Sequence, residues 1–346
     1  MHVNSTNYKG RKACNYCGPI GQNCDRGARA SSDITYIPEA IKLGAEVRPN
    51  STIFEITAGD DGRATGANYY NANGEQEFQP ANAVVVGCNG IGTPRMLLHS
   101  TSNSHPQGLL NSSGLVGKNL MFHVYAGASG FFNDLDAPTY RGPLACIIMS
   151  QEFYETDPSR DFKRGYTFQM GRGQGPAPTA TGGVSWGKNH HVEFAERFGK
   201  NLGLGVIGDD LPEEINRVEL DKKLTDRHGI PAPKIIYRVG DNSKRLLAHG
   251  VNSARTVLES AGASRIISSQ LNTNTGWHLM GTARMGEDPA RSVVNQYGQG
   301  HDADNVFIVD GSVFVTGAAV NPTPTIQALA LRTADYIRHE RSDLKS

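Results

Sequence analysis

The sequence is most informative at Gly276-Trp-His-Leu-Met-Gly-Thr-Ala-Arg-Met-Gly286. Two further stretches follow it in order, Val306-Phe-Ile-Val-Asp-Gly-Ser312 and Asn321-Pro-Thr-Pro-Thr-Ile-Gln-Ala-Leu-Ala330. The first of these begins with four apolar residues, which is typical of a strand buried on both faces. The second begins with turn-forming residues and continues with apolar residues at helical spacing. The end of the chain therefore predicts a buried strand followed by a helix, with His278 shortly before them.

An earlier stretch of the sequence also predicts a buried strand followed by a helix. Val84-Val-Val-Gly-Cys-Asn-Gly-Ile-Gly-Thr-Pro-Arg-Met-Leu-Leu-His-Ser100 predicts a buried strand, a glycine-rich turn and a helix. We expect Thr93-Pro94 to open that helix, because threonine caps helices and proline is tolerated at the first helical position. Farther along, residues 125–132 and 202–207 alternate like strands of an antiparallel sheet. An amphipathic helix is predicted over residues 243–260.

These stretches, together with Gly114-Leu-Val-Gly-Lys-Asn-Leu-Met-Phe-His123, closely resemble the glucose–methanol–choline (GMC) oxidoreductases. The resemblance covers roughly residues 14–340, and Phe122 stands where the family's VGxNLxDH element commonly has Asp. It implies an α/β fold with a Rossmann-like FAD-binding domain and an inserted α+β substrate domain that contains an antiparallel sheet. We expect residues 1–123 and 268–346 to form the FAD-binding domain and residues 124–267 the substrate-binding domain.

The resemblance also implies the catalytic residues. Oxidising an alcohol removes a hydroxyl proton and passes a hydride to an acceptor, and imidazole titrates close to working pH. His278 matches the family's base, and Asn321, 43 residues later, matches a second position where the family has His or Asn. An asparagine can orient the substrate oxygen but cannot take its proton. The alternatives are a buried core histidine at 278 and an ordinary helix-capping residue at 321.

Further positions match the family's cofactor contacts. A helix that starts near Pro322 and Thr323 would direct its positive dipole end at the flavin pyrimidine ring. Asp310 and Gly311 match the contact with the ribityl and pyrophosphate groups. Gly87 and Asn89 lie in the turn beside the cofactor, although the spacing G-x-x-G-x-G is a weak nucleotide fingerprint. Val47, in a segment predicted to be extended over residues 46–56, matches the position whose backbone meets the adenine.

The GxGxxG segment that binds the ADP part of FAD in this family is not present in the sequence. We therefore expect an incomplete Rossmann-like domain that is completed by an upstream chain. The alternative function is that of a truncated or non-catalytic subunit, which supplies the substrate domain to a partner that carries the FAD pyrophosphate loop.

Three of the five cysteines, Cys14, Cys17 and Cys24, are close together in the sequence. Some dehydrogenases of the family carry a cysteine-rich insertion here that holds an iron–sulfur cluster, and three thiolates suffice for a three-iron type. The other interpretation is three reduced cysteines in a glycine-rich loop. The sequence leaves both open.

The amino-acid composition of the chain limits the classes of partner that we expect. Lys+Arg and Asp+Glu number 34 each, so a concentrated basic face for nucleic acid is not expected. No stretch reaches the ~20 apolar residues of a membrane span. We expect a soluble protein, cytoplasmic or periplasmic, that acts on a sugar, glycoside or other polyol. The reduced flavin would be reoxidised by oxygen or by an electron-acceptor protein.

Overall fold

The computed structural model describes residues 2–18, 24–135, 139–141, 148–173, 175–273 and 275–344. By its internal contacts the chain divides into two compact units. The first, called here the sheet unit, comprises Met1–Val47, Val124–Gly208 and Lys244–Thr273. The second, called the α/β unit, comprises Arg48–His123, Asp209–Ser243 and Asn274–Ser346. The three-part domain division given above stays a prediction.

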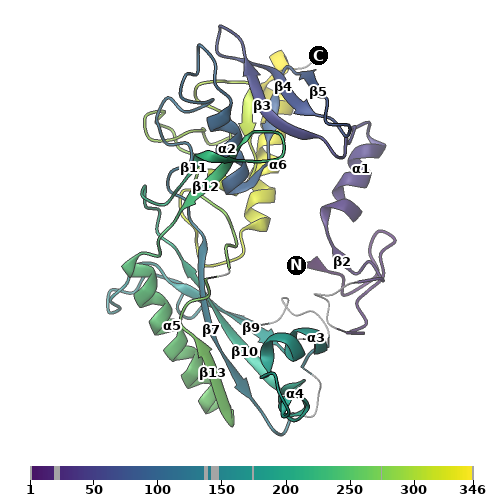
Figure 1. Ribbon diagram of the computed structural model, residues 1–346, viewed down its shortest axis with the longest axis vertical. Coiled ribbons are helices and arrows are strands. Elements are labelled where there is room, and N and C mark those ends of the chain that lie inside the picture. The colour runs from purple at the N-terminus through teal and green to yellow at the C-terminus, as the bar shows by residue number, and fades with distance from the viewer. Residues whose placement is uncertain are drawn as a thin grey trace. The chain divides into compact units, whose positions relative to one another are not determined.

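The sheet unit is built on a five-stranded antiparallel sheet with the order β13-β7-β10-β9-β8 (Figure 1). Its strands are β7 (His123–Phe131), β8 (Met149–Ser150), β9 (Tyr166–Arg172), β10 (Asn201–Asp209) and β13 (Arg265–Ser269). The antiparallel strands predicted over residues 125–132 and 202–207 are therefore confirmed as β7 and β10.

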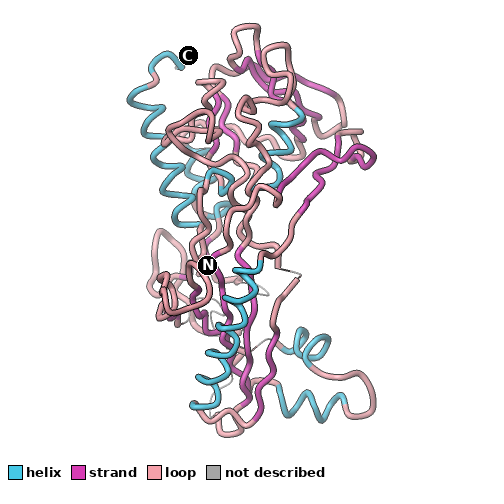
Figure 2. Tube along the Cα trace, turned by 90° about the vertical axis from the view of Figure 1, so that its left-hand side faces the viewer, coloured by secondary structure: helices cyan, strands magenta, loops and turns pink. Residues whose placement is uncertain are grey.

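The helix α5 (Asp241–Ser260) covers one face of this sheet, and Figure 2 shows it running along the strands. Its apolar stripe is buried and consists of Leu246, Leu247, Val251, Ala254 and Leu258. A side chain at Gly250 would collide with Val206 of β10, where its Cβ would stand 2.5 Å from Val206 Cγ1. The backbone of α5 therefore approaches the sheet closely at this glycine, and the amphipathic helix predicted for this segment is confirmed.

The rest of the sheet unit consists of short elements. They are β1 (His2–Val3), β2 (Arg29–Ala30), η1 (Ser32–Ile34), α1 (Tyr36–Lys42), α3 (Pro176–Pro178), the π-helical turn η2 (Thr179–Gly183) and α4 (His190–Arg197). β1 and β2 pair with each other as an antiparallel ribbon.

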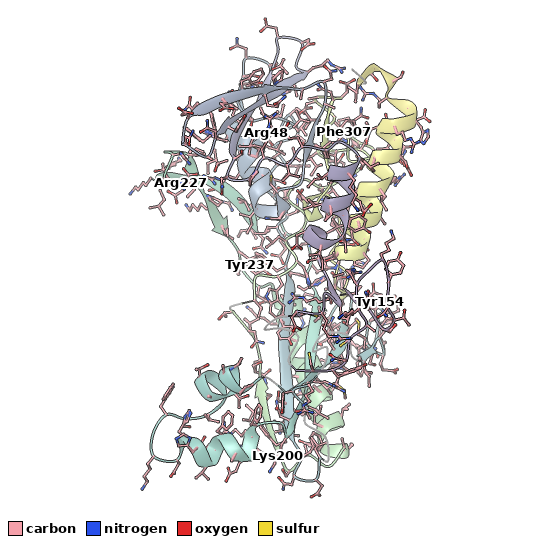
Figure 3. All side chains as sticks on the ribbon, turned by 90° about the vertical axis from the view of Figure 1, so that its right-hand side faces the viewer. Arg48, Tyr154, Lys200, Arg227, Tyr237 and Phe307 are labelled. Carbon is pink, nitrogen blue, oxygen red and sulfur yellow. The ribbon has the colours of Figure 1, made fainter. Side chains whose placement is uncertain are left out.

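The α/β unit contains a parallel strand pair. It also contains a three-stranded antiparallel sheet and a two-stranded antiparallel ribbon, both labelled in Figure 1. Its elements are β3 (Thr52–Ala58), β4 (Ala64–Tyr70), β5 (Gln76–Pro80), β6 (Val84–Val86), α2 (Asn89–His99), β11 (Arg217–Thr225), β12 (Pro231–Ile236), β14 (Val306–Ile308), η3 (Gly311–Val313), α6 (Thr323–Glu340) and η4 (Ser342–Leu344). β6 and β14 pair in parallel, Val86 opposite Ile308. Phe307 of β14, labelled in Figure 3, contacts the ring of Tyr336 on α6.

Two sequence predictions for this unit were wrong in detail. The apolar run at β6 was expected to be buried on both faces, but the side chain of Val85 is 53% exposed, because the described residues cover only one face there. The helix expected to open at Thr93-Pro94 begins at Asn89 instead, so Pro94 lies inside α2. Proline has no N–H to give to the carbonyl of Gly90, and Thr282 Oγ1 donates to that carbonyl at 2.8 Å in its place.

In the part of the chain that the structure describes, no helix has both the length and the apolar character needed to cross a bilayer.

Candidate active site

Three stretches that are distant in the sequence meet in the α/β unit. The segment 279–282 runs between the start of α2 and the turn after β14. A Cβ added at Gly90 would stand 2.7 Å from the carbonyl carbon of Leu279, and one added at Gly311 would stand 2.6 Å from the Leu279 oxygen. The N–H of Gly281 donates to the Gly311 carbonyl at 3.3 Å. The predicted site positions at Gly311 and around His278 therefore belong to one packed neighbourhood.

A short antiparallel contact places His278. Met121 and Met280 pair through both of their backbone hydrogen bonds. The N–H of His123 donates to the Trp277 carbonyl at 3.4 Å. His278 itself has a φ of +60°, a left-handed conformation that is uncommon for a residue with a side chain. Its backbone is held there by the pairing on either side.

The imidazoles of His123 and His278 contact each other directly. Their Nδ1 atoms lie 2.7 Å apart, and the rings meet edge to face at 72°. His123 is only 1% exposed, and its Nε2 lies 3.1 Å from the carbonyl oxygen of Gly317. Burial lowers the pKa of His123. Burial, and secondly the neighbouring His123, lowers the pKa of His278 to about 4. At neutral pH both rings are therefore uncharged.

A buried carboxylate supports the segment that precedes His123. Asp210 accepts hydrogen bonds from Tyr237 Oη at 2.6 Å and from Ser243 Oγ at 2.8 Å, and also from the backbone of Phe122. The ring of Phe122 packs edge-on against Tyr237, which is labelled in Figure 3. Burial raises the pKa of Asp210, and burial followed by the charge of Asp210 raises the pKa of Tyr237. Asp210 thus holds the backbone next to His123 in place.

Asn321 lies in the loop that leads into α6, and the same loop contains the carbonyl group to which His123 binds. Gly317, whose carbonyl binds His123, precedes Asn321 by four residues. The side chain of Ile326, in the first turn of α6, would contact a Cβ at Gly311 at 3.5 Å. Pro322, at the cap position, has no polar side chain to bind the first N–H groups of the helix. Asn321 and Thr323 are exposed and Pro322 is buried.

The start of α2 is satisfied by protein groups. Asn89 has a φ of +65°, and its Oδ1 accepts from the N–H groups of Ile91 and Gly92 at 2.9 and 3.3 Å. Asp310 accepts from the N–H of Asn89 at 3.1 Å, from Thr93 Oγ1 at 2.5 Å and from the N–H of Ser312 at 2.8 Å. Asp310 and Asn89 therefore order this turn, and Gly87 lies at its entry beside Val309.

Two predicted features belong to the sheet unit. The strand expected over residues 46–56 begins only at Thr52, so Val47 lies in a loop, and it belongs to the sheet unit. Cys14, Cys17 and Cys24 are described, yet within the described ranges no three His, Cys, Asp or Glu side chains are arranged to hold a metal. The iron–sulfur interpretation is not supported.

His123, Asp210 and Tyr237 were not predicted from the sequence to be parts of the site. His123 ends the quoted Gly114–His123 stretch, which is the one signal that could have identified it. Asp210 and Tyr237 lie in no motif, and only the folded chain brings them next to Phe122.

Comparison with known proteins identifies the family of this chain. Two family models, both described as GMC oxidoreductase, match residues 2–125 and 212–330. The chain belongs to the GMC oxidoreductase family, which confirms the resemblance found from the motifs.

Two curated relatives align over almost the whole chain. The 2-methyl-1,2-propanediol dehydrogenase of Mycolicibacterium austroafricanum is 39% identical over 97% of this chain and 62% of its own length. The fructose dehydrogenase large subunit of Gluconobacter japonicus is 30% identical over 97% of this chain and 62% of its own length. The chain thus spans about three-fifths of the length of these relatives.

Among solved structures, the formate oxidase of Aspergillus oryzae RIB40, studied for its FAD modification, aligns with a TM-score of 0.58 at 16% identity. The alignment covers 85% of this chain and 61% of that one. This likeness confirms the α/β fold class with antiparallel sheets.

Proposed function

We propose that this chain carries the catalytic groups of an FAD-dependent oxidoreductase that acts on CH–OH groups. The observation that supports this most directly is the half-buried, uncharged imidazole of His278, beside the loop that leads into α6. In this proposal His278 takes the proton of the substrate hydroxyl, because a neutral imidazole has a lone pair to accept it. Bound FAD would supply the hydride acceptor, N5 of the flavin.

The donor groups present fit such a cofactor. The exposed first turn of α6 receives no side-chain hydrogen bond from its cap residue and presents the positive end of a helix dipole, which suits the flavin pyrimidine ring. We assign Pro322 and Thr323 to this contact and Asn321 to the substrate oxygen. Gly311, whose missing side chain lets the backbone pack tightly, and Asp310 would lie along the ribityl and pyrophosphate groups. Gly87 and Asn89 would contact the cofactor through their backbone, and Val47 the adenine.

The proposed substrate is a sugar, a glycoside or another polyol. A cavity of about 610 Å³ lies on the five-stranded sheet. Its lining combines glycines and polar side chains, which include Tyr125, Arg172, Asn201 and Ser268, with apolar side chains such as Phe131 and Leu204. Such hydrogen-bonding groups suit a ligand rich in hydroxyl groups. The names of the two relatives, a diol dehydrogenase and a fructose dehydrogenase, support the same substrate class.

A protein partner is part of the proposal. The relative from Gluconobacter japonicus is by name a large subunit, which supports an assembly with another chain. We propose that such a partner completes the FAD site or accepts electrons from the reduced flavin.

The test is reduction of the bound flavin by substrate. The holoenzyme, mixed without oxygen with fructose, 1,2-propanediol or a glycoside, should lose its oxidised flavin absorbance with at least one of them. His278→Ala should lower kcat/KM by at least about 10²-fold, because a positioned base contributes 10²–10⁴-fold. His339→Ala, an exposed histidine near the end of α6, is the matched control and should be neutral.

Two results would contradict the proposal. One is protein, purified together with the chain that completes the FAD site, that shows no flavin absorption spectrum. The other is a His278→Ala enzyme whose turnover stays within a few-fold of the wild type while its flavin content is unchanged.

A further inference from the structure

The hydrogen bonds of the buried histidine determine where its proton sits. Nε2 of His123 lies 3.1 Å from the carbonyl oxygen of Gly317. A carbonyl oxygen only accepts, so Nε2 of His123 must carry the hydrogen and donate it. In a neutral imidazole the other nitrogen then has no hydrogen. Nδ1 of His123 is therefore an acceptor.

The contact between the two rings extends this to His278. The two Nδ1 atoms lie 2.7 Å apart, which is hydrogen-bond distance. Two bare nitrogens would repel at that separation, so one of them carries a hydrogen. Since Nδ1 of His123 has none, Nδ1 of His278 must be the donor. The remaining nitrogen of His278, Nε2, is left with its lone pair free.

We propose that His123 is a positioning residue, which accepts the Nδ1–H of His278 and thereby presents Nε2 of His278 as the base. This inference rests on the proposed function of His278. The contact with His123 fixes both the tautomer and the ring plane, because the hydrogen bond made by one ring nitrogen sets the state of the other. His123 can do this because its other side is held by Gly317 and its ring is buried.

The same contact assists the proton transfer itself. When the proton of the substrate hydroxyl moves to Nε2 of His278, the ring becomes positively charged. Its Nδ1–H then donates a charge-assisted hydrogen bond to the neutral His123, and such bonds are roughly twice as strong as neutral ones. While His123 is uncharged, the charged state of His278 thus gains a stronger hydrogen bond than the neutral state, which offsets part of the cost of burial. The repulsion by which His123 lowers the pKa of His278 arises only when His123 is itself charged.

Two substitutions at His123 separate this role from simple packing. In His123→Gln the amide group can donate to Gly317 and accept from His278, so the tautomer should be kept. In His123→Leu a side chain of similar bulk fills the space but cannot accept, so Nδ1 of His278 loses the partner that held its hydrogen. Thermal unfolding of each variant shows whether it folds.

The decisive readout is the ¹⁵N spectrum of the histidine rings in the holoenzyme, with the His278 signals assigned from their loss in His278→Gln. In the wild type and in His123→Gln we expect Nε2 of His278 without hydrogen and Nδ1 with it. In His123→Leu the population should shift toward the Nε2–H form. A wild-type His278 that carries its hydrogen on Nε2, or one whose tautomer is the same in His123→Leu, would overturn the inference.

Kinetics provide a second readout. His123→Leu should lower kcat by at least about tenfold, since a base in the wrong tautomer has no lone pair at the reacting atom, while KM stays close to the wild-type value. His123→Gln should regain most of kcat. Equal kcat values for the leucine and glutamine variants would also overturn the inference. The nitrogen spectrum needs no turnover, so an inactive wild type with the expected tautomer would count against the proposed function alone.

Discussion

Met121 and Met280 form both backbone hydrogen bonds with each other, at 3.0 and 3.1 Å, and both side chains are fully buried. In an antiparallel pair, the residue two positions after one partner faces the residue two positions before the other, on the same side of the pair. Here those residues are His123 and His278. The left-handed conformation of His278 interrupts the ladder, so the N–H of His123 binds Trp277 instead. The backbone pairing thus brings the two imidazoles together.

The first prediction concerns the pH dependence of turnover. Because burial lowers the pKa of His278 to about 4, the ring is neutral and able to accept a proton at all higher pH values. We expect kcat/KM to be constant between pH 5 and 7 and to fall as the pH drops through about 4. An acid limb near 6.5, the ordinary value for histidine, would contradict the burial of this ring.

Stability should respond to pH in the same range. The pKa values of His123 and His278 are lowered in the folded state, so the unfolded chain binds more protons as the pH falls from 7 toward 4. Protonation therefore favours unfolding, and the free energy of unfolding should decrease between pH 7 and pH 5. Urea titrations of the double variant His123→Gln/His278→Gln should show a smaller decrease. An equal slope in wild type and variant would mean that other groups dominate.

Asp210 should contribute strongly to stability. Its buried carboxylate binds Tyr237, Ser243 and the backbone of Phe122. Asp210→Ala leaves these donors without their acceptor, and we expect a loss of about 1–3 kcal/mol in the free energy of unfolding from urea denaturation. Asp60→Ala, an exposed carboxylate just after β3, is the control and should lose much less. Equal losses of unfolding free energy in the two variants would show that the buried hydrogen bonds of Asp210 do not stabilise the fold.

The carbonyl oxygen of Gly90 accepts a hydrogen bond from the hydroxyl group of Thr282. Pro94 cannot donate to it, and Thr282, which is fully buried, does so instead. Thr282→Val keeps the shape of the side chain but removes the donor. We therefore expect the free energy of unfolding, measured by urea denaturation, to fall by about 1–3 kcal/mol. Thr256→Val is the control, because Thr256 makes a similar side-chain bond to Asn252 on the exposed face of α5. If both variants were equally stable, the Gly90 carbonyl would not need Thr282.

The elements with strong periodic patterns could be predicted from the sequence, because local composition determines them. The stripe of α5, from Leu246 to Leu258, is of this kind, and so is the buried strand β14. The start of α2 could not be predicted, since it depends on Thr282, which comes from a distant segment. Of the site residues, only those that belong to sequence motifs could be predicted. His278, Asp310 and Gly311 belong to motifs, whereas the contact of His278 with His123 depends on long-range pairing.

The last prediction tests the proposed contact between α6 and the flavin. Thr323 is the first residue of α6 and is exposed. A negative charge there interacts favourably with the helix dipole, so Thr323→Glu should raise the free energy of unfolding by about 0.3–1 kcal/mol. The same charge would lie where the proposal places the flavin pyrimidine ring, which becomes more negative on reduction. We therefore expect Thr323→Glu to lower the reduction potential of the bound flavin and to weaken FAD binding, tenfold for roughly each 1.4 kcal/mol of lost interaction. Thr323→Gln, of the same length without charge, should leave both properties close to wild type. Stabilisation of the fold by the glutamate with no change in FAD affinity or potential would show that the start of α6 does not face the flavin.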